Sequence, residues 1–214
     1  MIASPRRHHF TASGLVLAHE HVLLVNHRRI GAWVPPGGHV EEFELPHQTV
    51  VREIVEETGV VVEVLGDRVP AESHPDAIFL SSPLYMQRVS AIERGEEFYH
   101  IDLAFLCRPL WLPGQGQLFS TGQAPPGDQR DGDPFGTEVK DVAASDKPPG
   151  SSRRHEVKEV RWVRLSELDT VRLADNVAQA IALAVSKLAQ YEAEERRSIV
   201  KPPCPNPGYN KHMK

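Results

Sequence analysis

The sequence has little cysteine, few aromatic residues and no excess of positive charge. Of its 214 residues two are cysteine and 7% are aromatic, and 24 Lys plus Arg stand against 29 Asp plus Glu, a formal net charge of −5. Cys107 and Cys204 are too few for a disulfide framework and form no CxxC pair, so we expect two inert thiols. An acidic chain also lacks the positive field that grips nucleic-acid phosphates, so nucleic acid is not an expected partner.

Long apolar runs are missing as well. The N-terminal stretch MIASPRRHHF lacks the apolar segment of a secretory signal. Segments such as IALAV are far shorter than the roughly 20 residues that a membrane helix needs. We therefore expect a cytoplasmic protein with no membrane partner.

Proline and glycine, in contrast, are plentiful, at 18 and 15 residues. Ten of the prolines fall in residues 112–150 and 199–214. The first of these segments also holds seven glycines, a composition typical of a mobile or disordered insertion. What remains has the size of one domain. We predict a single domain over residues 8–198, with an insertion at 112–150 that is either a lid or disordered, and a flexible tail at 199–214.

Hydrophobic periodicity predicts an α/β (α+β) chain with a mixed or largely antiparallel sheet. The expected strands are TASGLVLAH (11–19), VLLVNHR (22–28), VVVEVLGDRV (60–69), IFL (78–80), LYMQRV (84–89), FYHIDLAFLC (98–107) and EVKEVRWV (156–163), with a turn at 19–21. One helix is expected to begin at Pro46 and to end at Gly59. A short helix capped by Ser166 and a long one over 173–197 follow, the latter with apolar Val177, Ile181, Val185 and Leu188 at helical spacing.

The helix after Pro46 has an acidic side. At 100° per residue, the side chains of Glu53, Glu56 and Glu57 fall within an arc of about 100°. The residues predicted to face inward are Val50, Val51, Ile54 and Val55. Taken alone, three glutamates are most simply a solvated helix face, but carboxylates are also the ligands that Mg²⁺ prefers.

The residues around this helix form a recognisable pattern. From Gly38 to Val60 the chain reads glycine, five residues, Glu44, seven residues, and then REIVEETGV. This is a complete match to the 23-residue motif G-x5-E-x7-R-E-U-x-E-E-x-G-U, in which U is a bulky aliphatic residue. The sequence therefore resembles the Nudix hydrolase superfamily, and the resemblance extends over residues 8 to about 190 outside the insertion.

The resemblance implies an αβα sandwich with a mixed central sheet and a magnesium-dependent hydrolase. It implies that Glu53, Glu56 and Glu57 bind Mg²⁺, for which Mn²⁺ can substitute, with help from the Gly38 carbonyl, and that Arg52 and Glu44 form a supporting ion pair. The implied reaction is cleavage of the pyrophosphate linkage in a nucleoside diphosphate derivative, such as an ADP-ribose-like compound, a dinucleoside polyphosphate or a nucleoside triphosphate. The alternative is a nucleotide-binding or regulatory module without hydrolysis, although such modules usually have a degraded motif.

Several roles stay open at the level of sequence. The general base is Glu53, Glu97 or Asp102. Arg28 and His39 are candidates to contact substrate phosphate, and Trp33, with Phe10 and Tyr85 as further candidates, to stack on a base. The histidines form no HExxH arrangement, so zinc is not expected. A homodimer is possible, because the long C-terminal helix could pack on its own sheet or on a second subunit.

Overall fold

The architecture was taken from a computed structural model of the chain, which describes residues 8–66, 79–93, 96–112, 116–117 and 157–200. Its elements, in chain order, are β1 (His8–Ala18), β2 (His21–His27), β3 (Ala32–Val34), β4 (Gly37–His39), α1 (Pro46–Thr58), β5 (Val61–Leu65), β6 (Tyr85–Glu93), β7 (Glu96–Leu112), β8 (Gly116–Gln117), β9 (Val157–Arg164), a 3₁₀ helix (Leu165–Thr170) and α2 (Val177–Val200). The mixed α+β class is the predicted one.

The strands form a single mixed sheet. β1 lies at its centre and pairs in parallel with β7, whereas the other strand pairs are antiparallel. The N-terminal half of β1 also pairs with β4, and its C-terminal end pairs with β2. β1 thus connects the glycines of β4 to the rest of the sheet.

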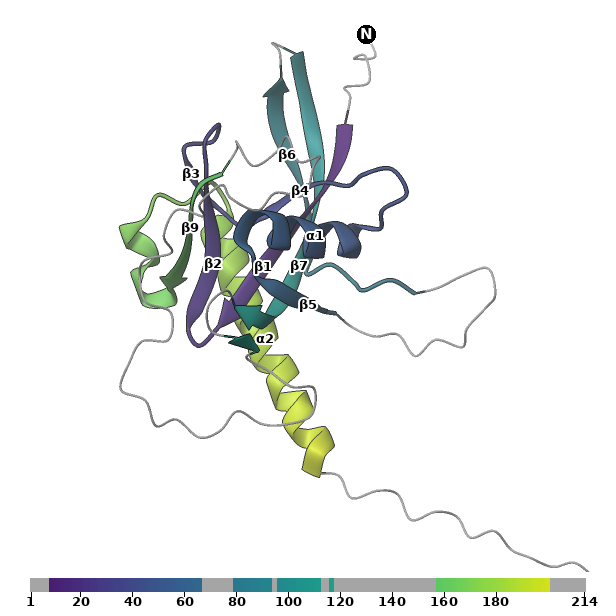
Figure 1. Ribbon diagram of the computed structural model, residues 1–214, viewed down its shortest axis with the longest axis vertical. Helices are drawn as coiled ribbons and strands as arrows, with labels where there is room; N and C mark the ends of the chain where they lie inside the picture. Colours follow the sequence, from purple (N-terminus) through teal and green to yellow (C-terminus); the bar gives the residue numbers. More distant parts are fainter. Residues whose placement is uncertain (1–7, 67–78, 94–95, 113–115, 118–156, 201–214) are drawn as a thin grey trace, which may run out of the picture.

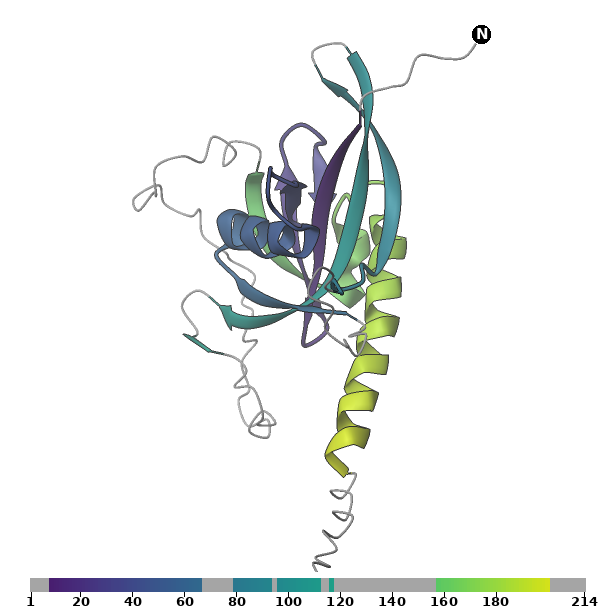
Figure 2. The same ribbon diagram turned by 90° about the vertical axis from the view of Figure 1, so that its right-hand side faces the viewer.

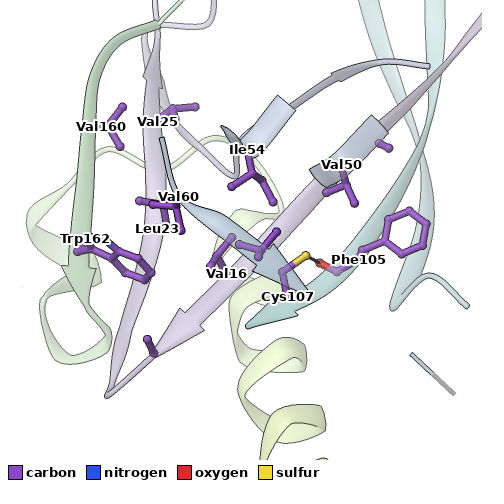
Figure 3. Packing of buried hydrophobic residues seen from close by; sticks show 13 residues of the cluster. Val16, Leu23, Val25, Val50, Ile54, Val60, Phe105, Cys107, Val160 and Trp162 are labelled. Atoms are coloured by element: carbon purple, nitrogen blue, oxygen red, sulfur yellow. Dashed lines mark hydrogen bonds between the residues drawn. The ribbon is translucent and has the colours of Figure 1, made fainter. Parts of the chain in front are cut away.

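One helix covers each face of the sheet (Figures 1 and 2). On the first face, Val50 and Ile54 of α1 pack into a core cluster with Val16 and Phe105 (Figure 3). On the second face, Val177 and Ile181 of α2 belong to a separate cluster. The predicted αβα sandwich is confirmed, and α2 packs on its own sheet.

Helix α1 lies very close to β1, and Gly14 is the reason. A Cβ atom at Gly14 would come within 2.5 Å of Ile54 Cδ1 and 2.9 Å of Val50 Cγ2. Real Cβ atoms do not approach so closely, so the absent side chain sets the distance between helix and strand. The predicted helix start at Pro46 is confirmed, as is its end at Gly59, which adopts φ = 74°.

Some predicted details are wrong. Phe79 and Leu80 lie outside any strand, and residue 78 lies outside the described part. Val55 is 40% exposed and Val185 is 37% exposed, because Val50 and Ile54 in α1, and Ala180 and Ala184 in α2, take the inward positions. Ser166 caps nothing, since the 3₁₀ helix begins directly after β9 with Arg164 at its N-cap.

The proline-rich segments fall mostly outside the described residues. Within the predicted insertion, Leu112 ends β7 and Gly116–Gln117 forms β8, and residues 113–115 and 118–150 are not described. α2 continues to Val200, two residues into the predicted tail, and 201–214 are not described. Among the residues placed here, no helix is long and apolar enough to cross a membrane.

Candidate active site

The acidic side of α1 faces a glycine pair at the end of the sheet. β4 aligns with β1 so that Gly38 lies opposite Ala12 and Gly37 opposite Ser13. The backbone N–H of Gly37 donates to Glu57 Oε2 at 3.1 Å. A Cβ atom at Gly38 would overlap the carboxylate of Glu53. Glycine at this position therefore leaves the space that the Glu53 carboxylate occupies.

Arg52 is the centre of the charge network on this face. It donates through Nε and Nη2 to the two carboxylate oxygens of Glu44, both at 2.8 Å. Its Nη1 donates to Glu53 Oε1 at 2.8 Å and to Glu56 Oε2 at 3.4 Å. Nη2 also reaches the backbone carbonyl of His39 at 3.3 Å. One guanidinium thus joins the loop before α1 to the helix and to the end of β4.

This network keeps Glu44 ionised. The hydrogen bond from Arg52 lowers the pKa of Glu44 to about 2, against the opposing effect of burial, and a hydrogen bond from Thr49 Oγ1 at 2.8 Å adds to it. The same pairing raises the pKa of Arg52. Thr49 was not predicted from the sequence as a partner of Glu44. Its position five residues after Glu44, in the first turn of α1, could have indicated this contact.

The donor set suits a hard divalent cation. Glu53, Glu56 and Glu57 supply carboxylate oxygens and Gly38 a backbone carbonyl, which are the ligand types that Mg²⁺ takes. Within the described part of the chain, no group of three or more His, Cys, Asp or Glu has an arrangement that could hold a metal ion. Arg52 lies between Glu53 and Glu56 and neutralises part of their charge. The metal role of these residues stays a prediction that rests on their chemistry.

Asp102 is the second buried carboxylate, and it lies in a different environment. It is 7% exposed and accepts hydrogen bonds from Thr11 Oγ1 and Ser13 Oγ, both at 3.0 Å, and from Gln87 Nε2 at 3.2 Å. Burial raises the pKa of Asp102 even though these hydrogen bonds act in the opposite direction. The three donors come from β1 and β6, so this carboxylate joins the strands on both sides of β7.

The sheet separates Asp102 from the α1 glutamates. Side chains alternate along a strand, and Asp102 shares its face with Ala104 and Leu106, which pack in the cluster around α2. Asp102 was a candidate general base. Its position on the α2 face removes it from direct contact with the carboxylates of α1.

Glu97, the other outside candidate for the base, is far from Gly38 along the sheet. Gly38 aligns with Ala12, and Ala12 aligns with Leu103. Glu97 precedes Leu103 by six residues, which at 3.3 Å per residue is about 20 Å along β7. Of the three candidates, only Glu53 lies beside the glycine pair in the part of the chain described here.

The predicted substrate contacts are scattered. Trp33 is 6% exposed and belongs to the cluster around α2, so a stacking role for its ring is not supported. Arg28 is exposed at the turn after β2 and donates to the carbonyl of Val157 at 3.5 Å. Phe10 is 48% exposed, and Tyr85 is partly buried.

His39 belongs to an aromatic group that sequence analysis missed. Its ring lies edge-on to His100 at 5.0 Å and to His9 at 5.4 Å, and Phe98 lies 5.1 Å from His100. β1 and β7 pair in register with His9 opposite His100, which brings these rings together. The alternating patterns of HFTAS (9–13) and YHID (99–102) would have predicted this group of rings only if the parallel pairing of the two strands had been known.

Comparison with known proteins agrees with this geometry. A family model described as NUDIX domain matches residues 7–101, a range that contains α1 and β4. The fold is similar to that of a NUDIX-family hydrolase from Clostridium perfringens, with 20% identity, a TM-score of 0.56, and coverage of 84% of this chain and 97% of that one. It is also similar to a NUDIX hydrolase from Nitrosomonas europaea, with 13% identity, a TM-score of 0.50, and coverage of 85% and 90%.

Proposed function

We propose that this chain, which belongs to the Nudix superfamily, is a magnesium-dependent pyrophosphohydrolase that cleaves a nucleoside diphosphate derivative. The observation that carries the proposal is the packing of Glu53 and Glu57 against the glycine pair of β4, beside an arginine that is itself fixed by Glu44. All carboxylates of the motif are present, which favours hydrolysis over binding alone.

The chain's own groups divide the work. Glu53, Glu56, Glu57 and the Gly38 carbonyl would hold Mg²⁺. The bound ion would neutralise pyrophosphate charge and lower the pKa of a water molecule. Arg52, held in a two-point contact by Glu44, orients Glu53 and Glu56 through Nη1.

Glu53 is our candidate for the group that accepts a proton from water. It lies beside Gly38, whereas Asp102 lies on the α2 face and Glu97 far along β7. Arg52 bonds one oxygen of Glu53, Oε1 at 2.8 Å. A general base must be within hydrogen-bond reach of the proton it takes, and position is therefore the first criterion.

The test is a substrate panel assayed with Mg²⁺, with Mn²⁺ and with EDTA. The panel contains ADP-ribose, dinucleoside polyphosphates, and normal and oxidised nucleoside triphosphates. We expect turnover of at least one compound, dependent on the metal, with products that show cleavage between two phosphorus atoms. Binding of a panel compound by calorimetry without any turnover in Mg²⁺ would instead identify a nucleotide-binding module and overturn the proposal.

A further inference from the structure

Strand β6 lies at an edge of the described sheet, where β7 is its only paired strand, and it projects from the body of the sheet. It pairs with β7 over nine residues in a continuous antiparallel register, from Tyr85 opposite Ala104 to Glu93 opposite Glu96. Both views show the β6–β7 hairpin projecting past α1 (Figures 1 and 2). The strand contains no proline, and its pairing shows no bulge. An edge of this kind can pair with another strand.

The projecting strand exposes apolar side chains. Met86 is 58% exposed, Val89 40% and Ile92 68%. Between Met86 and Ile92 the only charged residue is Arg88, whose guanidinium carbon lies 5.8 Å from the centre of the Tyr99 ring. Natural edge strands usually carry charges that oppose pairing. β6 carries two charged residues, Arg88 and the terminal Glu93, and Arg88 is placed over the ring of Tyr99 on its own neighbouring strand.

The order of residues in β6 is self-complementary. Two copies can pair antiparallel about a two-fold axis at Val89, so that residue 89 of one copy faces residue 89 of the other. In this Val89 register, Met86 of each copy lies directly opposite Ile92 of the other. The two are the most exposed apolar side chains of the strand, and directly opposed side chains on one face contact each other. A register centred on Arg88 would instead place two arginines directly opposite each other. The apolar pattern and the charge therefore favour the Val89 register.

The surface next to Ile92 is also hollowed. The hollow is lined by Ser90, Ala91, Ile92, Glu97 and Phe98. In the Val89 register, the partner's Met86 lies opposite Ile92, one of the residues that line this hollow. Methionine is long and unbranched, so its side chain can reach toward such a depression.

We propose that two copies of this chain associate by antiparallel pairing of their β6 strands about Val89, which joins their sheets into one. A closed two-fold contact of this kind uses the same patch on both copies. The contact is remote from the glycine pair and does not depend on the proposed hydrolysis.

The first experiment measures the mass of the full chain by sedimentation velocity over a range of concentrations. We expect a dimer, and we expect Met86→Lys and Ile92→Glu each to raise its dissociation constant at least about tenfold, a cost of 1.4 kcal/mol. The double variant Met86→Lys/Ile92→Glu should recover much of the loss, because the two new charges face each other in the Val89 register. Leu183→Lys, at a residue 46% exposed on α2, is the matched control and should leave the mass unchanged.

A second experiment tests the register directly. In a Cys204→Ser background, Val89→Cys should form a disulfide-linked dimer under mild oxidation, because residue 89 faces itself across the axis. Arg88→Cys, which faces residue 90, should link much less. The remaining native thiol, Cys107, is buried and should not react. A chain that is monomeric at every concentration, or a dimer that neither single charge variant weakens, would overturn the proposal.

Discussion

Each face of the sheet holds a hydrogen-bonded carboxylate, and the two carboxylates are stabilised in opposite ways. On the α1 face, Glu44 forms a two-point ion pair with Arg52, which lowers the pKa of Glu44 to about 2. On the α2 face, Asp102 is surrounded by hydroxyl and amide donors, and its pKa is raised by burial. The charge of Glu44 is thus balanced by the positive charge of Arg52, whereas the hydrogen bonds to Asp102 come from neutral groups.

The two carboxylates therefore differ in what they do. Glu44 belongs to a network of opposite charges, whereas Asp102 connects neighbouring strands. Arg52 touches three carboxylates, and a divalent cation would add positive charge to the same region. The donors to Asp102 come from the strands on either side of β7, so their bonds hold the sheet together. We therefore expect changes on the α1 face to affect catalysis and stability, and changes at Asp102 to affect mainly the pH dependence of stability.

The largest effect on stability should come from Arg52→Met. This change leaves the carboxylates of Glu44 and Glu53 without their shared cation, and we expect a loss of about 3 kcal/mol in the free energy of unfolding, measured in urea. Arg196→Met is the control, because that arginine is 76% exposed and pairs with Glu192 on the surface of α2. Its loss should stay below about 0.5 kcal/mol. Equal losses of stability for the two variants would show that Arg52 contributes no more than an exposed surface arginine.

Gly38→Ala should act on catalysis more than on stability. The new methyl group would overlap the Glu53 carboxylate and displace it. A displacement on the order of 1 Å at a catalytic group can cost about a hundredfold in rate, and we expect a fall of that size in kcat. Gly31→Ala places a methyl group in open space at a glycine with φ = 66°, so it should strain the turn and leave kcat unchanged. A fully active Gly38→Ala variant would contradict the assigned position of Glu53.

Glu44→Gln should remove a pH-dependent contribution to stability. The folded-state pKa of Glu44 is about 2 and its ordinary value is 4.5, so its ion pair stabilises the wild type fully above pH 4.5. That advantage over the variant, about 1.5 kcal/mol, should disappear as the pH falls from 4.5 to 2. Unfolding free energies of both proteins across this range provide the measurement. A constant difference would mean that Glu44 is not held as an ion by Arg52.

Asp102→Asn should give the smallest effect, and one of opposite sign. Because the folded-state pKa of Asp102 lies above its ordinary 3.8, the wild type loses stability relative to the variant as the pH rises from 3.8 through the raised pKa. We expect a change of no more than about 1 kcal/mol between the ends of this range. If the stability difference between wild type and variant changed with pH in the same direction for Asp102→Asn and for Glu44→Gln, the two carboxylates would not be stabilised in opposite ways.

Local signals in the sequence predicted the α1 side well. Pro46 and Gly59 set the ends of the helix through backbone geometry, and the spacing from Gly38 to Val60 carries the resemblance to the Nudix superfamily. The Arg52–Glu44 ion pair, expected from the resemblance, is present as a two-point contact.

The sequence could not specify contacts that depend on strand pairing. Thr11, Ser13 and Gln87 meet Asp102 only because β1 and β6 are the neighbours of β7. The exposure of Val55 is likewise decided by where α1 rests on Gly14. A helix periodicity shows which residues share a side, but the partner surface decides how wide the buried stripe is.

The central claim is that the glutamates of α1 support metal-dependent hydrolysis. Its most direct test is the initial rate on the best panel substrate as a function of Mg²⁺ concentration, for the wild type, Glu56→Gln, Glu57→Gln and the exposed control Glu167→Gln. We predict no rate in EDTA, a saturable rise with Mg²⁺ in the wild type and the control, and a loss of at least about a hundredfold in both α1 variants, with their far-UV spectra unchanged. A wild-type rate that persists in EDTA, or full activity in both α1 variants, would contradict the account.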